Sequence, residues 1–210
     1  MMLLDKIKSY RVVLASQSPR RRELLNGLGV SFEVMQSHEP EVVDGGWKPQ
    51  EAVCHLSLQK AAHVFAQLSV PQVPLSSPEP SVHAVPSVYP TLSTPPLLVI
   101  GGDTIVVSED RILGKPHDRE EAFAMLQQLS GKTHHVYSGL RFMTSRQQLC
   151  DCDVTEVTFE PLGKDDMDYY IDRFHPFDKA GSYGVQEWIG YRGIRALNGS
   201  FYTVVGLPTH

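Results

Sequence analysis

Cysteine is scarce in this chain of 210 residues. The three cysteines, Cys54, Cys150 and Cys152, cannot all pair with one another, and no second cysteine pair completes a zinc site beside the C-x-C of Cys150 and Cys152. Such sparse cysteines are typical of proteins from a reducing compartment. We therefore expect structural thiols, with a metal-binding or redox role as the alternative.

Long apolar runs are missing as well. No stretch approaches the roughly 18 apolar residues of a membrane span. The N-terminal stretch, MMLLDKIKSYRVVLAS, has neither an uninterrupted apolar core nor a small-residue cleavage site. We therefore expect no export and no membrane anchor, and predict a cytoplasmic protein.

Positive charge is in short supply. The chain has 19 Lys and Arg residues against 24 Asp and Glu residues, a formal net charge of −5. Proteins that wrap nucleic acid usually have a basic surplus or a basic face, so we expect no nucleic-acid partner. The apolar share of 41% is too high for a disordered chain, and glycine is far below collagen levels. The length predicts one globular domain over residues 1–210, built as two small lobes at most.

Proline is concentrated in one segment. Residues 68–96 hold eight of the 15 prolines, six serines and a single charged side chain, Glu79. So much proline excludes a helix or a central strand. We interpret the segment as a surface insertion, extended or disordered. The alternative is a P-x-x-P ligand, but the flanking basic residue of such a motif is absent.

Hydrophobic periodicity and turn residues predict alternating strands and helices. In the N-terminal half, strands are predicted over 11–15, 31–36 and 97–102, and helices over 19–29, 49–67 and 118–129. In the C-terminal half, the predicted elements are a long hairpin of strands 134–145 and 152–159, a helix over 165–174 and a second hairpin over 195–205, turned at Asn198-Gly199. This order predicts the α/β class, with a mixed central sheet and flanking helices.

The first predicted helix begins with an unusual charge pattern. Ser18 and Pro19 supply an N-cap and a proline at the first helical position, and Arg20, Arg21 and Arg22 follow within the first turn. Cations at a helix N-terminus oppose the helix dipole, at a cost of about 0.3–1 kcal/mol each when exposed. An anionic ligand in front of this turn would offset that cost. The alternative is a solvated basic face.

Three carboxylates occupy positions suited to metal or acid–base chemistry. Asp103, in GGDT, follows a short apolar strand that ends in glycines, where α/β proteins place catalytic and metal-binding carboxylates. Glu39 and Glu41 follow another predicted strand and could join Asp103 around a divalent cation. Ordinary cap and loop carboxylates are the alternative for all three.

Two lysines and one glycine-rich segment complete the candidate residues. Lys60 shares an apolar stripe of its helix, so it either reaches the rim or meets a buried anion. Lys115 lies between glycine and proline in GKP, where an exposed lysine is the ordinary interpretation. In FDKAGSYGVQ, residues 177–186, two glycines favour close backbone contact, while Lys179 and Gln186 offer a charge and an amide that can read a base. A tight structural loop is the alternative.

Taken together, these features agree on one ligand. Arginines at a helix start, two lysines distant in sequence and a carboxylate at a strand end suit a polyphosphate with a divalent metal. No Walker A sequence occurs, so the chain is not a P-loop enzyme.

Six ordered motifs carry a family resemblance. LASQSPRRRELL, GGDTIV, GKP, LSGKTHHVYSG, DKAGSYGVQ and NGSFYTVVGLP together resemble the Maf family of nucleoside triphosphate pyrophosphatases. The match runs from about Val12 to Pro208 and is interrupted by the proline-rich insertion. DKAGSYGVQ, with its glutamine, resembles the branch that acts on dTTP and UTP. The resemblance implies hydrolysis of the α–β phosphoanhydride of these or modified pyrimidine nucleotides. It also implies a mixed-sheet fold related to the inosine-triphosphate pyrophosphatases, a divalent cation (Mg²⁺, with Mn²⁺ as the alternative) and a homodimer.

Position by position, the resemblance also implies roles for individual residues. Asp103 would be the general base and, with Glu41, would hold the metal. The phosphates would be bound by Ser16, Arg20, Arg21, Lys60 and Lys115, and base choice would be tuned by Arg20, Thr104 and Gln186. This sequence departs from the family pattern at Gly102, where alanine is more usual, and in SHEPE around Glu39–Glu41. It also stops at His210, where we expect a terminal helix to continue.

Two other functions remain as alternatives. A nucleotide-binding regulator of cell division with little catalysis would use the same pocket, but would not need the base Asp103. A nucleic-acid-binding domain would use the arginine cluster, but the acidic total and the lack of an interleaved aromatic–basic stripe count against it.

Overall fold

The computed structural model describes residues 3–38, 46–69 and 95–210. Glu39 and Glu41 lie outside the described residues, as does all but the ends of the proline-rich segment. In the part of the chain that is described, no helix combines the length and the apolar character that a bilayer crossing needs.

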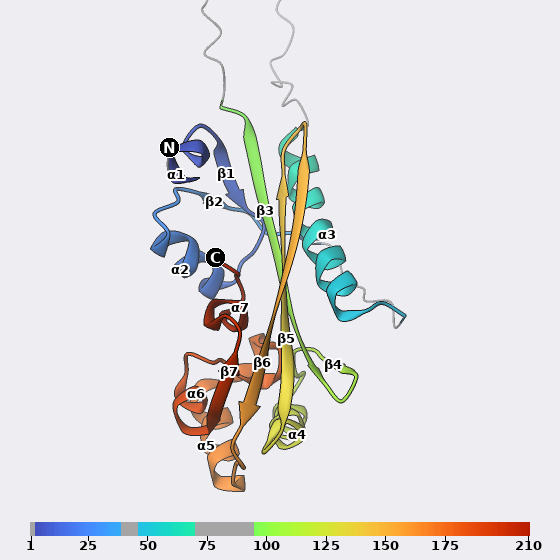
Figure 1. Ribbon diagram of the computed structural model, residues 1–210, viewed down its shortest axis with the longest axis vertical. Coiled ribbons are helices and arrows are strands. Elements are labelled where there is room, and N and C mark those ends of the chain that lie inside the picture. The colour runs from blue at the N-terminus through green and yellow to red at the C-terminus, as the bar shows by residue number, and fades with distance from the viewer. Residues whose placement is uncertain (1–2, 39–45, 70–94) are drawn as a thin grey trace, which may run out of the picture.

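The described chain folds around one mixed sheet of seven strands (Figure 1). The strands are β1 (Arg11–Leu14), β2 (Glu33–Val34), β3 (Leu97–Ser108), β4 (Arg111–Leu113), β5 (Thr133–Met143), β6 (Gln148–Phe159) and β7 (Ile194–Asn198). Their order is β2-β1-β3-β5-β6-β7, with β4 paired to β3. β1 runs parallel to β2 and β3, and the other pairs are antiparallel. The predicted α/β class with a mixed central sheet is confirmed.

Helices cover both faces of this sheet. They are α1 (Leu3–Ile7), α2 (Pro19–Gly27), α3 (Pro49–Ser69), α4 (Arg119–Leu129), α5 (Lys164–Phe174), α6 (Trp188–Gly193) and α7 (Phe201–Val205), with short 3₁₀ turns η1 (Pro176–Asp178) and η2 (Ala180–Ser182). In Figure 1, α3 lies along one side of the long strands, and α2 and α7 lie on the other. Apolar clusters fill the space between helices and sheet, the largest around Leu126, Phe159, Tyr170 and Ile189. The division into two lobes stays a prediction.

β3 is twice as long as predicted. The glycines at 101 and 102 were interpreted as the end of the strand, which is wrong, because the strand continues to Ser108. Gly101 instead allows α3 to pack directly on the strand, since a Cβ atom there would lie 2.3 Å from the carbonyl oxygen of Ser57. Asp103 therefore lies inside β3 and not beyond its end.

One edge of β3 is interrupted. β1 pairs with residues 97–100 of β3, and β4 pairs with residues 106–108. Within the described residues, no strand pairs with residues 101–105 on this edge, while β5 continues along the other edge. We call this interval, residues 101–105 of β3, the edge gap. Side chains from both faces of β3 can reach the same space at the edge gap.

The second predicted hairpin, over 195–205, is also wrong. β7 ends at Asn198, and residues 201–205 form helix α7 instead of a returning strand. Gly199, with a φ of 132°, turns the chain tightly against Thr155. The Thr203 hydroxyl donates to the Asp153 carboxylate, and its carbonyl accepts from Ser138 Oγ at 2.7 Å. These contacts hold α7 across β5 and β6, where a further edge strand would not reach.

The three cysteines are free thiols. Cys54 in α3 lies close to Cys150 in β6, with 2.8 Å between the two sulfur atoms. Burial, followed by the hydrogen bond between the Cys54 and Cys150 thiols, raises the pKa of the Cys54 thiol to about 12. Because the thiolate is the reactive form, Cys54 is held in its unreactive state at neutral pH.

Candidate active site

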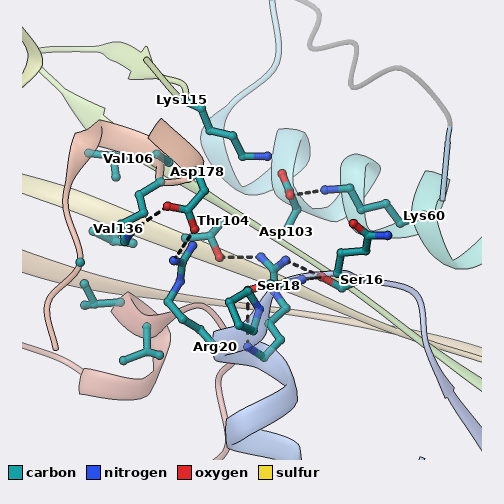
Figure 2. Close-up of a pocket in the computed structure, with 18 of the residues that line it drawn as sticks. Ser16, Ser18, Arg20, Lys60, Asp103, Thr104, Val106, Lys115, Val136 and Asp178 are labelled. Carbon is teal, nitrogen blue, oxygen red and sulfur yellow. Dashed lines mark hydrogen bonds and ion pairs between the residues drawn. The ribbon is translucent and has the colours of Figure 1, made fainter. Parts of the chain in front are cut away.

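A pocket of about 420 Å³ opens at the edge gap (Figure 2). All the predicted site residues that the structure describes line it: Ser16, Arg20, Arg21, Lys60, Asp103, Thr104, Lys115 and Gln186. The elements that contribute them are the β1–α2 turn, α2, α3, β3, the segment after β4 and the segment after η2. Residues separated by up to 170 positions in sequence therefore share one cavity.

The start of α2 forms one wall of the pocket. Ser18 caps the helix, as predicted, by accepting a hydrogen bond from the backbone N–H of Arg21. Ser16 Oγ accepts from the backbone N–H of Ser18 at 3.2 Å. The first turn of a helix presents unsatisfied N–H groups and a positive dipole end. This wall is therefore suited to an anion.

Arg21 joins three segments of the chain at the pocket. Its guanidinium donates to Gly206 O at 2.8 Å, to Ser16 Oγ at 3.1 Å and to Thr104 Oγ1 at 3.0 Å. The residue is only 8% exposed. One side chain thus joins the β1–α2 turn, β3 and the end of α7, and fixes two of the predicted ligand-binding hydroxyls.

Asp103 and Lys60 form a close ion pair inside the pocket. Lys60 Nζ in α3 donates to Asp103 Oδ1 at 2.5 Å, and the side chains are 15% and 10% exposed, respectively. Lys115, from the segment after β4, points toward Asp103 from the opposite side (Figure 2). The two lysines predicted to bind phosphate therefore flank the predicted base.

Part of the pocket wall is apolar. Val106, Val136, Val204 and Val205 line it together with Gln186, whose side chain carries both a donor and an acceptor. A planar, largely apolar group with polar edges matches such a lining. The pocket thus combines charged side chains with an apolar part of its wall.

Two pocket residues, Asp178 and Lys179, and the neighbouring Glu187 were not assigned a site role from the sequence. Asp178 accepts from Arg20 at 2.9 Å and from Lys179 at 2.7 Å, and Lys179 also lies 3.2 Å from Glu187. Burial raises the pKa of Asp178, but hydrogen bonds and charges from Lys179 and Arg20 outweigh it, so the pKa lies below its usual value. Asp178 and Lys179 belong to the glycine-rich motif, and Glu187 follows it directly. The motif was thus a signal for all three.

Of the predicted metal ligands, the structure describes Asp103 alone. Among the described residues, no group of three or more His, Cys, Asp or Glu side chains could hold an ion. Asp103 Oδ1 lies 2.5 Å from Lys60 Nζ, and Lys115 points toward the same carboxylate (Figure 2). Mg²⁺ in nucleotide enzymes is commonly bound by one or two carboxylates together with substrate phosphates. Asp103 fits that arrangement, and Glu41 stays a prediction.

Comparisons with known proteins agree with these features. Residues 11–210 match the Maf family, described as Maf-like protein. A relative from Porphyromonas gingivalis named dTTP/UTP pyrophosphatase is 40% identical over 211 residues, which cover 99% of this chain and 94% of the relative. Proteins of the same name are similar in Phocaeicola vulgatus, with 38% identity over 98% of this chain and 94% of the relative, and in Bacillus velezensis, with 40% identity over 94% of this chain and 90% of the relative. The chain therefore belongs to the Maf family.

Proposed function

We propose that this protein hydrolyses dTTP and UTP to the nucleoside monophosphate and pyrophosphate. The observation that carries the proposal is the convergence of Asp103, Lys60 and Lys115 in the same pocket that Gln186 lines. Relatives of about 40% identity over nearly the whole chain are named for this activity. The hydrolase class and the dTTP/UTP branch predicted from the sequence agree with those names.

Asp103 would act as the general base. Lys60 holds Oδ1 at 2.5 Å and so fixes the direction of the carboxylate. The carboxylate takes a proton from water, the water oxygen bonds to the α-phosphorus, and the bond from that phosphorus to the bridging oxygen breaks. Pyrophosphate leaves with the bridging oxygen. Lys60, Lys115 and the arginines of α2 stabilise the negative charge that develops on it.

A divalent cation, Mg²⁺ or Mn²⁺, would be held by Asp103 and by the phosphates of the substrate. When bound, it would neutralise phosphate charge.

Base choice would depend on Gln186. A glutamine amide both donates and accepts, which suits the O4 and N3–H edge of uracil or thymine. Cytosine presents the opposite pattern at these two positions. We therefore propose that the enzyme prefers UTP to CTP, with Arg20 and Thr104 contributing to the choice, as the family resemblance implies.

The setting of the reaction is part of the proposal. We propose a cytoplasmic enzyme that forms a homodimer and uses no nucleic acid, in line with the acidic composition and the family resemblance.

Release of pyrophosphate from dTTP and UTP with Mg²⁺ tests this function. We expect Asp103→Asn to lower kcat by about 10²–10⁴, because general-base catalysis contributes that much. The matched control is Asp110→Asn, in the exposed turn between β3 and β4. Near-normal turnover by Asp103→Asn would defeat the assignment. Tight nucleotide binding without any pyrophosphate release by the unmodified protein would favour the regulator instead.

A further inference from the structure

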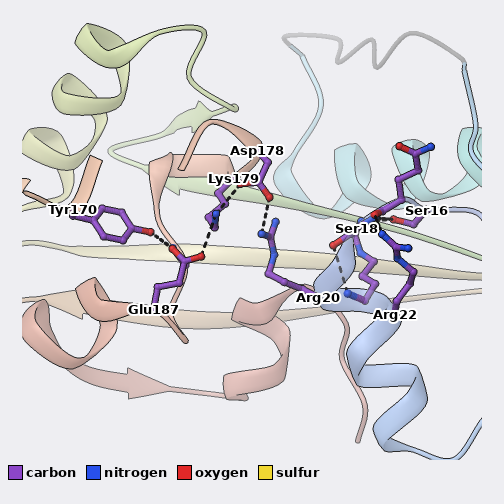
Figure 3. Close-up of polar contacts among 11 residues, drawn as sticks. Ser16, Ser18, Arg20, Arg22, Tyr170, Asp178, Lys179 and Glu187 are labelled. Carbon is purple, nitrogen blue, oxygen red and sulfur yellow. Dashed lines mark hydrogen bonds and ion pairs between the residues drawn. The ribbon is translucent and has the colours of Figure 1, made fainter. Parts of the chain in front are cut away.

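A buried hydroxyl lies behind the glycine-rich segment that carries Gln186. Tyr170 in α5 is 0% exposed. Its hydroxyl donates to the carboxylate of Glu187 and accepts from the backbone N–H of Gly184 at 3.0 Å (Figure 3). Burial, followed by the bond to Glu187, raises the pKa of Tyr170, so the hydroxyl keeps its proton. A single side chain thus holds both ends of the segment 184–187.

Glu187 is itself held from a second direction. Lys179 Nζ lies 3.2 Å from Glu187 Oε1, and the two side chains are 8% and 20% exposed. Charged groups this buried are costly unless they are paired, so each fixes the position of the other. Lys179 also donates to the Asp178 carboxylate, which accepts a second hydrogen bond from Arg20 (Figure 3). Glu187 therefore cannot move without disturbing the pocket wall.

The segment between these anchors is a tight turn. The backbone N–H of Glu187 donates to Gly184 O at 3.0 Å. A Cβ atom at Gly184 would lie 2.9 Å from Glu187 Cδ and 3.1 Å from Gln186 Nε2. The Gln186 amide is therefore packed against the turn, and its position depends on the position of the turn.

We propose that Tyr170 and Glu187 are positioning residues for base selection, which act by fixing the turn that carries Gln186. Neither residue lines the pocket. The inference rests on the proposed function, in which Gln186 reads the base. A displaced amide would still meet the base but would discriminate less well between uracil and cytosine, because hydrogen bonds weaken steeply with misalignment.

Tyr170→Phe tests this inference, because it removes the hydroxyl and keeps the ring. We expect the ratio of kcat/KM for UTP to that for CTP to fall about 3- to 10-fold, the range that one or two hydrogen bonds supply. Most of the fall should come from a higher KM for UTP, with kcat nearly unchanged. Tyr169→Phe, at the next position of the same helix and half-exposed, is the matched control and should leave the ratio unchanged.

A double-substitution cycle separates positioning from a general structural effect. If Tyr170 acts through Gln186, Gln186→Ala lowers the UTP to CTP ratio, and adding Tyr170→Phe lowers it little further. If the two substitutions lower the ratio independently, so that their effects multiply in the double variant, the inference is overturned. It is also overturned if Tyr170→Phe lowers kcat/KM equally for UTP and CTP. If Tyr170→Phe fails to fold in a thermal scan, Glu187→Gln provides the same test, because it keeps the acceptor for Tyr170 and removes the charge paired with Lys179.

The outcomes also distinguish this inference from the proposed function. If the unmodified protein releases no pyrophosphate, the proposed function fails, and the ratio is then measured as the Kd of non-hydrolysable UTP and CTP analogues. If the unmodified protein prefers UTP and both variants keep that preference, the positioning inference fails and the proposed function stands.

Discussion

At the scale of single residues, Arg21 connects the most distant parts of the chain. Its three hydrogen bonds reach residues 16, 104 and 206, and the side chain is nearly buried. Arginine is suited to this task because its planar guanidinium presents donors in fixed directions. Lysine has the same charge but offers a single nitrogen atom, which cannot reach three acceptors spread in this way.

We predict that Arg21→Lys lowers the free energy of unfolding by about 2–4 kcal/mol, because hydrogen bonds to a charged group are lost and their buried acceptors are left without this donor. Urea denaturation measures the change. Arg22→Lys is the matched control: Arg22 is exposed and donates to Gln17 O at 2.9 Å, so its loss should cost less than about 1 kcal/mol. Equal costs at the two positions would contradict this role of Arg21.

A second prediction concerns His134, which is 0% exposed and has Nε2 2.7 Å from the Tyr183 hydroxyl. Burial, followed by the charge of His135, lowers the pKa of His134 to about 3. In the unfolded chain the pKa is about 6.5. Between these values the unfolded state binds the extra proton, so this residue makes the free energy of unfolding fall by about 1.4 kcal/mol per unit as the pH drops from 6.5 toward 3.

The measurement is the slope of unfolding free energy against pH from 6 to 4. His134→Gln should have a shallower slope than the unmodified protein, whatever its stability at pH 7. His135→Gln, whose side chain is 43% exposed, should change the slope less. An unchanged slope in His134→Gln would show that this histidine is not held neutral.

At the scale of elements, the contact between α3 and the sheet sets the position of Lys60. Two glycines make the close approach feasible, because Cβ atoms at Gly101 and Gly139 would lie 2.3 Å and 2.6 Å from the α3 carbonyl oxygens of Ser57 and Val53. Carbonyl oxygens of a helix cannot turn aside as a flexible side chain can. A shift of these strands would therefore move α3 and, with it, the position of Lys60 in the pocket.

We predict that Gly101→Ala displaces α3, lowers the free energy of unfolding by about 1–3 kcal/mol and raises KM for dTTP, because overpacking forces backbone shifts and moves Lys60 away from Asp103. Denaturation and steady-state kinetics measure the two effects. Gly27→Ala, with nothing within 4 Å of its Cβ position in α2, should instead be neutral or stabilising by up to about 1 kcal/mol. A Gly101→Ala variant with unchanged KM would contradict the link between helix and pocket.

Local patterns predicted most of these elements. The cap Ser18 lies where the sequence placed it, because an N-cap is a local interaction, and Asp118 caps α4 in the same way. The end of β3 and the second hairpin were predicted wrongly for the same physical reason. Glycine at 101 and Asn-Gly at 198–199 are turn signals in isolation. In the folded chain, however, Gly101 packs against α3 and Gly199 packs against Thr155, and both contacts are distant in sequence.

At the scale of the whole molecule, the pocket joins regions that pack in different apolar clusters. Leu14, next to the β1–α2 turn, belongs to one cluster, and Tyr183 and Val185, next to Gln186, belong to another. A nucleotide that fills the pocket would contact residues from both regions. Binding to the folded state alone raises its stability by mass action.

We predict that a non-hydrolysable dTTP analogue with Mg²⁺, at about 100 times its Kd, stabilises the protein by about 2.7 kcal/mol and raises Tm by about 5–11 °C. A thermal scan measures the shift, and EDTA should reduce it if the metal contributes to binding. Thymidine, which lacks the phosphates, should give no shift at the same concentration. A shift as large with thymidine would show that the charged side chains of the pocket are not used.

The family and most of the pocket residues could be predicted from the sequence because six motifs carry them, whereas Lys60 lies outside these motifs and was singled out by its place on the apolar stripe of its helix. Convergence of Ser16, Lys60, Asp103 and Gln186 in one cavity is confirmed, although their chemical roles stay predictions. Tyr170 could not have been found in this way. Nothing near it in the sequence marks its contact with Gly184 and Glu187, because the helix α5 meets the glycine-rich segment only in the folded chain.

The edge gap has a consequence for how this site could be lost or redesigned. An open strand edge is usually a hazard, since it invites a neighbouring molecule to add a strand. Here β1 and β4 leave bare only a short interval, bordered by charged side chains. Extending β1 by a few residues in register would complete the ladder and eliminate the cavity while every reactive side chain remained in the chain. The residue at which β1 ends, before the arginines of α2, is therefore as decisive for activity as the arginines themselves.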